Sequence, residues 1–208
     1  MQAGVDYFIE KLSPHHQSNK FSLGPDPDLR PLKSFLQNNA HDYQVANVAV
    51  TYVAVLPAAD KERPRIIGYV TLTCSEIKMK GAYTLEDCEH AMRYDSMPAL
   101  KVARLARHHQ YKGAGIGEAL MEFAIAMAVD HIAHSVGCRF LVTDSKANSV
   151  WFYERMGLTL LDTDENKVRK EPLMFLDLNK LIYDDAPEPE VAHLDDSEAE
   201  TPDALPRD

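Results

Sequence analysis

The sequence predicts an α/β fold: a mixed, mostly antiparallel sheet of six or seven strands with helices on both faces. Two runs rich in β-branched residues, 46–56 and 65–73, flank a charged loop at 58–64, which indicates an antiparallel hairpin. A strand, a glycine turn, a long apolar helix and a second strand follow between residues 100 and 142. The 208 residues, 45% of them hydrophobic, suffice for one such core but not for two large domains.

The elements before the hairpin are short. Residues 5–12 have a strand-like composition, and the glycine, proline and aspartate residues at 24–28 are typical of a turn. Apolar residues recur at helical spacing from Leu32 to Ala40. We therefore expect a short amphipathic helix there.

The middle of the chain contains the strand, turn and helix unit. In residues 84–94 a threonine is followed three residues later by an aspartate, which predicts a short capped helix. Residues 100–106 are typical of a strand that enters the glycine turn. The helix expected at 115–136 is apolar on most of its surface, and residues 140–142 follow as a buried strand.

Three further elements complete the predicted domain. A helix is expected from 146 to 156, where Gly157 occupies the position that ends many helices. Strands are expected at 158–161 and 173–178, separated by a charged loop at 162–171. Residues 1–180 are accordingly assigned to one domain.

Residues 181–208 are predicted to form an acidic tail. From residue 184 onward the chain has ten acids, one base and four prolines. The formal net charge of -10 therefore belongs almost entirely to this segment. Because it has few large apolar residues to bury, we expect it to be disordered.

Composition and N-terminal pattern favour a cytoplasmic protein. Residues 1–12 carry two acids and lack the basic and then apolar order of a signal peptide. Glu118, Glu122 and Asp130 interrupt the long apolar helix, so we do not expect a membrane span.

The cysteines suggest neither disulfides nor a metal site. They are odd in number, widely spaced and not in a ligand pattern, so we expect reduced structural thiols: Cys74, Cys88 and Cys138. Asp130, His131 and His134 near a helix end could suggest a metal site, but polar residues there more simply complement the helix dipole.

The glycine-rich turn at residues 109–117 is the strongest functional signal. Alternating Gly113, Gly115 and Gly117 let the backbone approach a bulky anion, at which the first N–H groups of the helix point. A nucleoside triphosphate loop would need lysine and serine or threonine after the last glycine, where the chain has Glu118. A dinucleotide-binding oxidoreductase would need another glycine spacing and more strand and helix units, which makes it the weakest alternative. A coenzyme A pyrophosphate site is the third interpretation.

Two motifs favour that third interpretation. One is Gln110-x-x-Gly113-x-Gly115, set between a strand and a long helix, and the other is the run 142–146 followed by 152–158. Together they resemble the GCN5-related N-acetyltransferase superfamily, most of all the branch that includes bacterial acetyltransferase toxins. The resemblance covers about residues 8–178 and includes the segments 68–72 and 103–106.

The resemblance implies an acetyl-CoA-dependent N-acetyltransferase that transfers the acetyl group directly to a primary amine, without a metal. Tyr153 would be the general acid that protonates the departing thiolate, and the usual tyrosine pKa of about 10 keeps it protonated at neutral pH. Backbone N–H groups at 106–108 and the glycine turn would hold the acetyl carbonyl, the pantetheine and the pyrophosphate. The coenzyme-binding residues that the resemblance implies are Leu105, Ala106, Arg107, His108, Gln110, Tyr111, Lys112, Gly113, Ala114, Gly115, Ile116, Gly117 and Lys146.

Some assignments stay open at this point. Lys146 stands where many members of the superfamily have an asparagine that contacts the coenzyme, and Asn148 is out of register. Glu76, His108 and His109 are candidates for the general base. An α-amine, with a pKa of about 7.7 to 8, is partly neutral at physiological pH, whereas a lysine would need a base.

The acceptor is an amine of unknown class. The toxin branch acetylates the α-amine of amino acids charged on transfer RNA, so the resemblance suggests transfer RNA, an antitoxin and a homodimer as partners, and no membrane. Residues 1–183 carry 21 bases and 22 acids, which gives a weak field for a polyanion. A noncatalytic acyl-CoA-binding module is a further alternative, but the presence of Tyr153 favours an enzyme.

Overall fold

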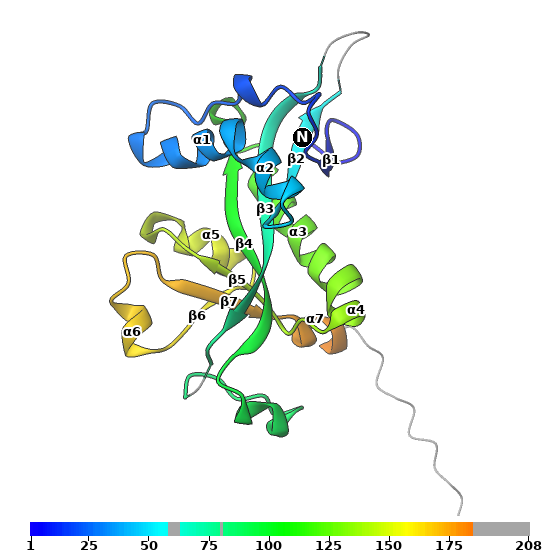
Figure 1. Cartoon of the computed structure of the whole chain (residues 1–208). Coiled ribbons are helices and arrows are strands. Elements are labelled where there is room, and N and C mark those ends of the chain that lie inside the picture. The colour runs from blue at the N-terminus through cyan, green and yellow to red at the C-terminus, as the bar shows by residue number, and fades with distance from the viewer. Residues whose placement is uncertain (58–62, 80, 185–208) are drawn as a thin grey trace, which may run out of the picture.

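The computed structural model describes residues 1–57, 63–79 and 81–184, and it has the predicted α/β architecture (Figure 1). Seven strands form one sheet in the order β1-β2-β3-β4-β5-β7-β6. Every neighbouring pair is antiparallel except β4 and β5. The strands are β1 (Phe8–Lys11), β2 (Val50–Leu56), β3 (Arg65–Ile77), β4 (Met97–Arg107), β5 (Phe140–Asp144), β6 (Thr159–Leu160) and β7 (Leu173–Asp177).

Helices cover both faces of the sheet, as predicted. Successive side chains of β2 point to opposite faces of the sheet. Val53 packs in the hydrophobic cluster that contains Phe35 of α1, and Ala54 packs in the cluster that contains Leu120 of α3. Tyr153 of α5 belongs to the α3 cluster. The helices are α1 (Arg30–Asn38), α2 (Ala40–Val45), α3 (Ile116–Ala126), α4 (His134–Val136), α5 (Val150–Arg155), α6 (Asp164–Lys167) and α7 (Leu178–Asp184).

A bulge in β4 redirects the side chains near its end. Thr71 pairs with Arg104 and Leu72 with Val102, which leaves Ala103 without a partner on β3. Val102 therefore packs in the α3 cluster, whereas Ala106 packs in the α1 cluster. In a regular strand both would face the same side, because they are four residues apart.

The helix predicted at 84–94 is wrong. The structure has only a 3₁₀ turn, Glu89–Arg93, in this segment. Asp87 does not support a helix start, because its carboxylate accepts hydrogen bonds from Arg139 (2.7 Å) and Asn179 (3.0 Å). These bonds hold the segment between β3 and β4 to the beginning of β5 and of α7.

Other boundaries also differ from the prediction. The helix expected at 32–40 is α1, which begins and ends two residues earlier, and a second helix that was not predicted, α2, follows it. The loop expected at 162–171 contains α6, whose first turn is capped by the Thr163 hydroxyl. The helix expected at 115–136 is α3, a π-helical turn Met127–Ala133 and α4. Helix α7 continues past the predicted domain boundary at residue 180. The hairpin loop at 58–62 and the tail from 185 to 208 lie outside the described residues. No helix in the described ranges is long and apolar enough to cross a membrane.

Candidate functional site

The parallel strands β4 and β5 separate and leave a gap in the sheet. They pair only between Ala99–Lys101 and Phe140–Val142, after which β4 continues to Arg107 without β5 as a neighbour. At the point of separation, the Thr143 hydroxyl donates a hydrogen bond to Val102 O (3.0 Å).

The end of β4 turns backbone amides toward this gap. The His108 N–H donates to Ile67 O of β3 (2.7 Å), so it is already bound on the other side. Backbone groups alternate between the two edges of an antiparallel strand, and the N–H groups of Leu105 and Arg107 therefore point into the gap. An extended ligand with amide groups can pair with these two N–H groups. The His108 N–H was also expected to bind the coenzyme, but it is already bonded to Ile67 O.

The glycine turn lies where β4 ends and α3 begins. Gly113 and Gly115 have positive φ values of 79° and 74°, and no atom lies within 4 Å of the position that a Cβ would occupy at either residue. The N–H groups of Ile116, Gly117 and Glu118 belong to the first turn of α3, which has no preceding carbonyl for them within the helix. This open turn with free N–H groups is suited to a phosphate.

Polar side chains flank the turn. Arg65 Nη2 donates to Gln110 Oε1 (2.6 Å), which fixes the Gln110 side chain beside the turn. The positive side chains of Arg107 and Lys112 line a cleft next to the turn. Neither has an ion-pair partner among the residues that the structure describes.

His108 holds the turn in place and does not line the cleft. Its residue is only 2% exposed, and its Nδ1 accepts a hydrogen bond from the Gln110 N–H (3.3 Å). Burial lowers the pKa of His108 below 6.5, and the nearby His109 and Arg65 lower it further. The neutral ring packs edge-on against Phe21 and stacks on His109, so we interpret His108 as a structural residue.

Tyr153 lies at the inner part of the same cleft. Its residue is 8% exposed, and its helix α5 is fixed near the turn because Phe152 packs against Gly117, where an added Cβ would lie 3.5 Å from Phe152 Cε2. Burial raises the pKa of the Tyr153 hydroxyl above 10.0, and a hydrogen bond with Thr143 acts in the opposite direction. The hydroxyl is therefore protonated at neutral pH and can donate a proton.

The cleft has a volume of about 750 Å³ and brings together residues from distant parts of the chain. Its far wall, formed by Leu23, Asp26, Leu29 and Leu32, was not predicted from the sequence. Six of the predicted site residues do not line the cleft: His108, Gln110, Tyr111, Ala114, Ile116 and Lys146. Those that line it are Leu105, Ala106, Arg107, Lys112, Gly113, Gly115, Gly117 and Tyr153.

Lys146 connects two segments on either side of the cleft lining without lining the cleft itself. Its Nζ donates to Asp28 O (2.7 Å), which joins the loop after β5 to the segment before α1. Asn148 and Ser149, from the same loop, line the cleft in its place. A coenzyme contact by Lys146 stays a prediction.

The candidates for the general base are separated by the structure. Glu76 lies near the end of β3, accepts a hydrogen bond from Ser96 (2.8 Å) and lines a different hollow. His109 lines the cleft together with Asp26 and Glu118. Of the three predicted candidates, His109 is the one that lines this cleft, at the end of β4 next to the glycine turn.

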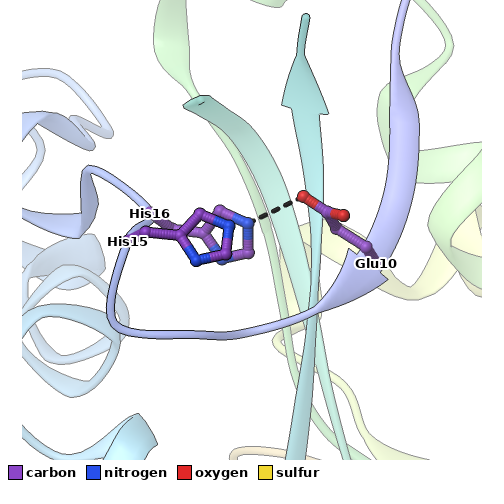
Figure 2. A group of neighbouring side chains, drawn as sticks. All are labelled: Glu10, His15 and His16. Atoms are coloured by element: carbon purple, nitrogen blue, oxygen red, sulfur yellow. Dashed lines mark hydrogen bonds and ion pairs between the residues drawn. The ribbon is translucent and has the colours of Figure 1, made fainter. Parts of the chain in front are cut away.

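A separate cluster of metal-binding residue types is formed by β1 and the turn that follows it. Figure 2 shows Glu10, His15 and His16, whose ligand atoms lie within 4.8 Å of one another. The Ser13 N–H donates to His16 Nδ1 (3.0 Å), so His16 Nε2 carries the proton that it donates to Glu10 Oε1 (2.8 Å). A metal ion at Nε2 would require a ring without any proton, or loss of the Ser13 bond. We interpret the cluster as a hydrogen-bonded brace between β1 and the following turn.

Comparisons with known proteins agree with this geometry. Residues 49–158 match the family model of the acetyltransferase (GNAT) domain. A search of the curated proteins found no match.

Among solved structures, a tyrosine-to-phenylalanine mutant of KacT superposes with a TM-score of 0.71 at 21% identity, over 85% of this chain and 98% of that one. AtaT complexed with acetyl-methionyl-tRNAfMet gives 0.71 at 20% identity, over 85% and 98%. AtaTR bound with AcCoA gives 0.67 at 19% identity, over 85% and 96%.

The solved structures establish the likeness of the fold, and the family model establishes the relationship. The matched region spans more than half of the chain and contains the separating strands, the glycine turn and Tyr153. The chain therefore belongs to the GNAT acetyltransferase family and is an acyltransferase.

Proposed function

We propose that the protein transfers an acetyl group from acetyl-CoA directly to a primary amine, with Tyr153 as the general acid. The observation that carries this proposal is a buried, protonated tyrosine hydroxyl in the same cleft as the glycine turn and the unpaired half of β4. A noncatalytic coenzyme-binding module would need the turn and the strand edge but not the tyrosine.

The coenzyme fits the cleft in one direction. Its pyrophosphate would bind the N–H groups that begin α3, with Lys112 beside them. Its pantetheine amides would pair with the free edge of β4 at Leu105 and Arg107. The thioester would then lie where β4 and β5 separate, close to Tyr153.

The chemistry needs no covalent enzyme intermediate. The neutral amine attacks the acetyl carbonyl carbon, a C–N bond forms, and the C–S bond breaks as the tetrahedral intermediate collapses. Tyr153 gives its proton to the departing sulfur, and the ammonium proton passes to water. The products are the N-acetylated amine and coenzyme A with a free thiol.

A second candidate names the acceptor as the α-amine of an amino acid charged on transfer RNA. It is supported by the fold likeness to AtaT complexed with acetyl-methionyl-tRNAfMet. An α-amine also needs less help from a base than a lysine does, because more of it is neutral at physiological pH. The fold likeness to AtaT bound to the C-terminus of the antitoxin AtaR supports an antitoxin as a further candidate partner.

The test is thiol release from acetyl-CoA in the presence of separate amine classes. Charged transfer RNA, lysine peptides, polyamines and small amines are each incubated with the full chain, and uncharged transfer RNA is the control. Thiol release that needs an amine supports the proposal, and release with charged transfer RNA alone selects the second candidate. Tight binding of acetyl-CoA without release in any arm would favour the noncatalytic module.

A further inference from the structure

Trp151 is a large aromatic residue left exposed beside the glycine turn. It is 56% exposed, and it is the single tryptophan of the chain. Its Nε1–H donates to Asn148 O (3.0 Å), and its ring meets Phe152 edge-on with 6.2 Å between the centroids. The indole is therefore held in one orientation although more than half of the residue surface faces solvent.

Arg155 lies one helical turn further along α5, on the same face as Trp151. Its guanidinium carbon is 5.9 Å from the Trp151 ring centroid. Within the described ranges, Arg155 has no carboxylate partner. Trp151 and Arg155 thus present a flat apolar face next to an available double hydrogen-bond donor.

Both side chains border the cleft next to the proposed pyrophosphate site. They line the same 750 Å³ cleft as Gly113 and Gly115. Phe152, the residue after Trp151, packs against Gly117 in the first turn of α3. This packing holds α5 close to the proposed pyrophosphate site. A group attached to the pyrophosphate and leaving the cleft can therefore reach α5.

Coenzyme A supplies such a group. Its thioester end must lie near the buried Tyr153, so the nucleotide end extends from the pyrophosphate toward the exposed edge. That end consists of a planar adenine and a ribose with a 3′-phosphate. Adenine can stack on an indole, and a phosphate can bind a guanidinium through two parallel hydrogen bonds.

We propose that Trp151 and Arg155 form the 3′-phosphoadenosine subsite of the coenzyme, where Trp151 stacks on the adenine and Arg155 binds the 3′-phosphate. This inference rests on the proposed function, because it assumes that acetyl-CoA occupies the cleft. It makes two exposed residues of α5 responsible for recognising the nucleotide and gives them no part in the acetyl transfer itself.

The single tryptophan provides a direct readout. Titration of the full chain with acetyl-CoA, and separately with adenosine 3′,5′-bisphosphate, should quench the tryptophan fluorescence, because both ligands carry the adenine and only one carries the thioester. Trp151→Ala should raise the Kd for acetyl-CoA about tenfold by calorimetry, within the range found for loss of a stacked base. Because Trp151 is exposed, this variant should keep the melting temperature of the wild type.

Arg155 is tested by comparing two forms of the coenzyme. Arg155→Gln should weaken the binding of coenzyme A about tenfold and leave the binding of 3′-dephospho-coenzyme A unchanged. Glu154→Gln is the matched control, because Glu154 is exposed on the same helix but does not line the cleft. Glu154→Gln should leave both the kcat and the KM for acetyl-CoA unchanged, whereas Trp151→Ala and Arg155→Gln should each raise the KM for acetyl-CoA about tenfold.

Three results would overturn the subsite. One is binding of both nucleotides without any change in fluorescence. Another is an equal effect of Arg155→Gln on the two coenzyme forms. The third is a Trp151→Ala variant that raises only the KM of the acceptor, which would assign the indole to the acceptor. If the wild type neither binds acetyl-CoA nor releases thiol, the proposed function fails as well, so the two failures are distinguishable.

Discussion

Replacing Tyr153 by phenylalanine should separate catalysis from coenzyme binding and from stability. The substitution keeps the ring and removes one buried hydroxyl. Thr143 loses this neighbour, but its own proton still goes to Val102 O (3.0 Å), so no buried donor is left without an acceptor. We therefore expect a loss of ~1 kcal/mol of unfolding free energy, or about 2–4 °C in melting temperature.

The loss in turnover should exceed what this loss in stability explains. General acids contribute about 10²–10⁴-fold to a rate. The departing group is a thiol with a pKa of roughly 8.5, which leaves more readily than an alkoxide, so we expect a loss at or below the lower bound of that range, about 10–100-fold in kcat. This corresponds to ~1.4–2.8 kcal/mol of transition-state stabilisation. The Kd for acetyl-CoA should stay within about twofold, because the hydroxyl would act on the sulfur only as the bond breaks.

The assay is thiol release at saturating acetyl-CoA and saturating amine, with the Kd measured by calorimetry and the melting temperature by circular dichroism. Tyr83→Phe is the matched control. It also removes a tyrosine hydrogen bond, to Asp177 Oδ2 (2.8 Å), while Arg139 keeps two bonds to the same carboxylate. Tyr83 lines a hollow different from the catalytic cleft, so its loss should leave kcat unchanged. A wild-type kcat in Tyr153→Phe would refute the role of the tyrosine.

Three further predictions concern the turn, the packing beneath it and the pH dependence. Gly115→Ala forces an alanine into a φ of 74° at a cost of ~1–2 kcal/mol and adds a methyl group at the phosphate site, so KM for acetyl-CoA should rise at least about tenfold. Gly137→Ala, at a φ of 77° and a ψ of 109° outside the cleft, should lower the melting temperature at least as much without changing KM. Gly68→Ala places a Cβ 2.6 Å from Ile116 Cγ2. This overpacking should lower the free energy of unfolding by ~1–3 kcal/mol and weaken coenzyme binding, because it displaces the start of α3. An unchanged melting temperature would show that α3 shifts without a cost in stability. The active form of Tyr153 is protonated, and burial raises the pKa of its hydroxyl, so activity should be lost only as the pH rises through that raised pKa. The value of kcat/KM should therefore show no alkaline decline below about pH 10. A decline near pH 8 would point to another acid.

The part of the cleft formed by the end of β4 and the glycine turn could be predicted from the sequence, because it is built from residues that are neighbours in the chain. Gly113 and Gly115 adopt the positive φ values that favour glycine, and the strand before them and the helix after them follow from periodicity. Tyr153 was placed by its motif, since on helical spacing alone it resembles a core aromatic.

The far wall could not be predicted in the same way. Leu23 and Leu29 come from an irregular segment, and only the packing of α1 on the sheet brings them opposite the glycine turn. Leu23 is buried and Leu29 half-buried, and no pattern in this segment indicates what the two side chains face. Trp151 and Arg155 did give a signal, since an aromatic and a cation four residues apart on an exposed helix face have no packing role.

The bulge at Ala103 and the 3₁₀ turn at Glu89–Arg93 depend on tertiary contacts. A bulge is one unpaired residue with no required residue type at this site, and periodicity cannot locate it. In the segment around Asp87, the bonds to Arg139 and Asn179 replace those of the expected helix. Arg139 and Asn179 are distant in the sequence, so local propensity favoured the wrong structure.

The separation of β4 from β5 gives the sheet a third open edge, inside the fold instead of at its margin. Water must satisfy the Leu105 and Arg107 amides while the cleft is empty. On the proposed function, acetyl-CoA acts as a substitute strand that completes the hydrogen-bond ladder of the sheet. The resistance of the folded chain to unfolding is then linked to the supply of its own cosubstrate, rising with each increase in free acetyl-CoA above the dissociation constant.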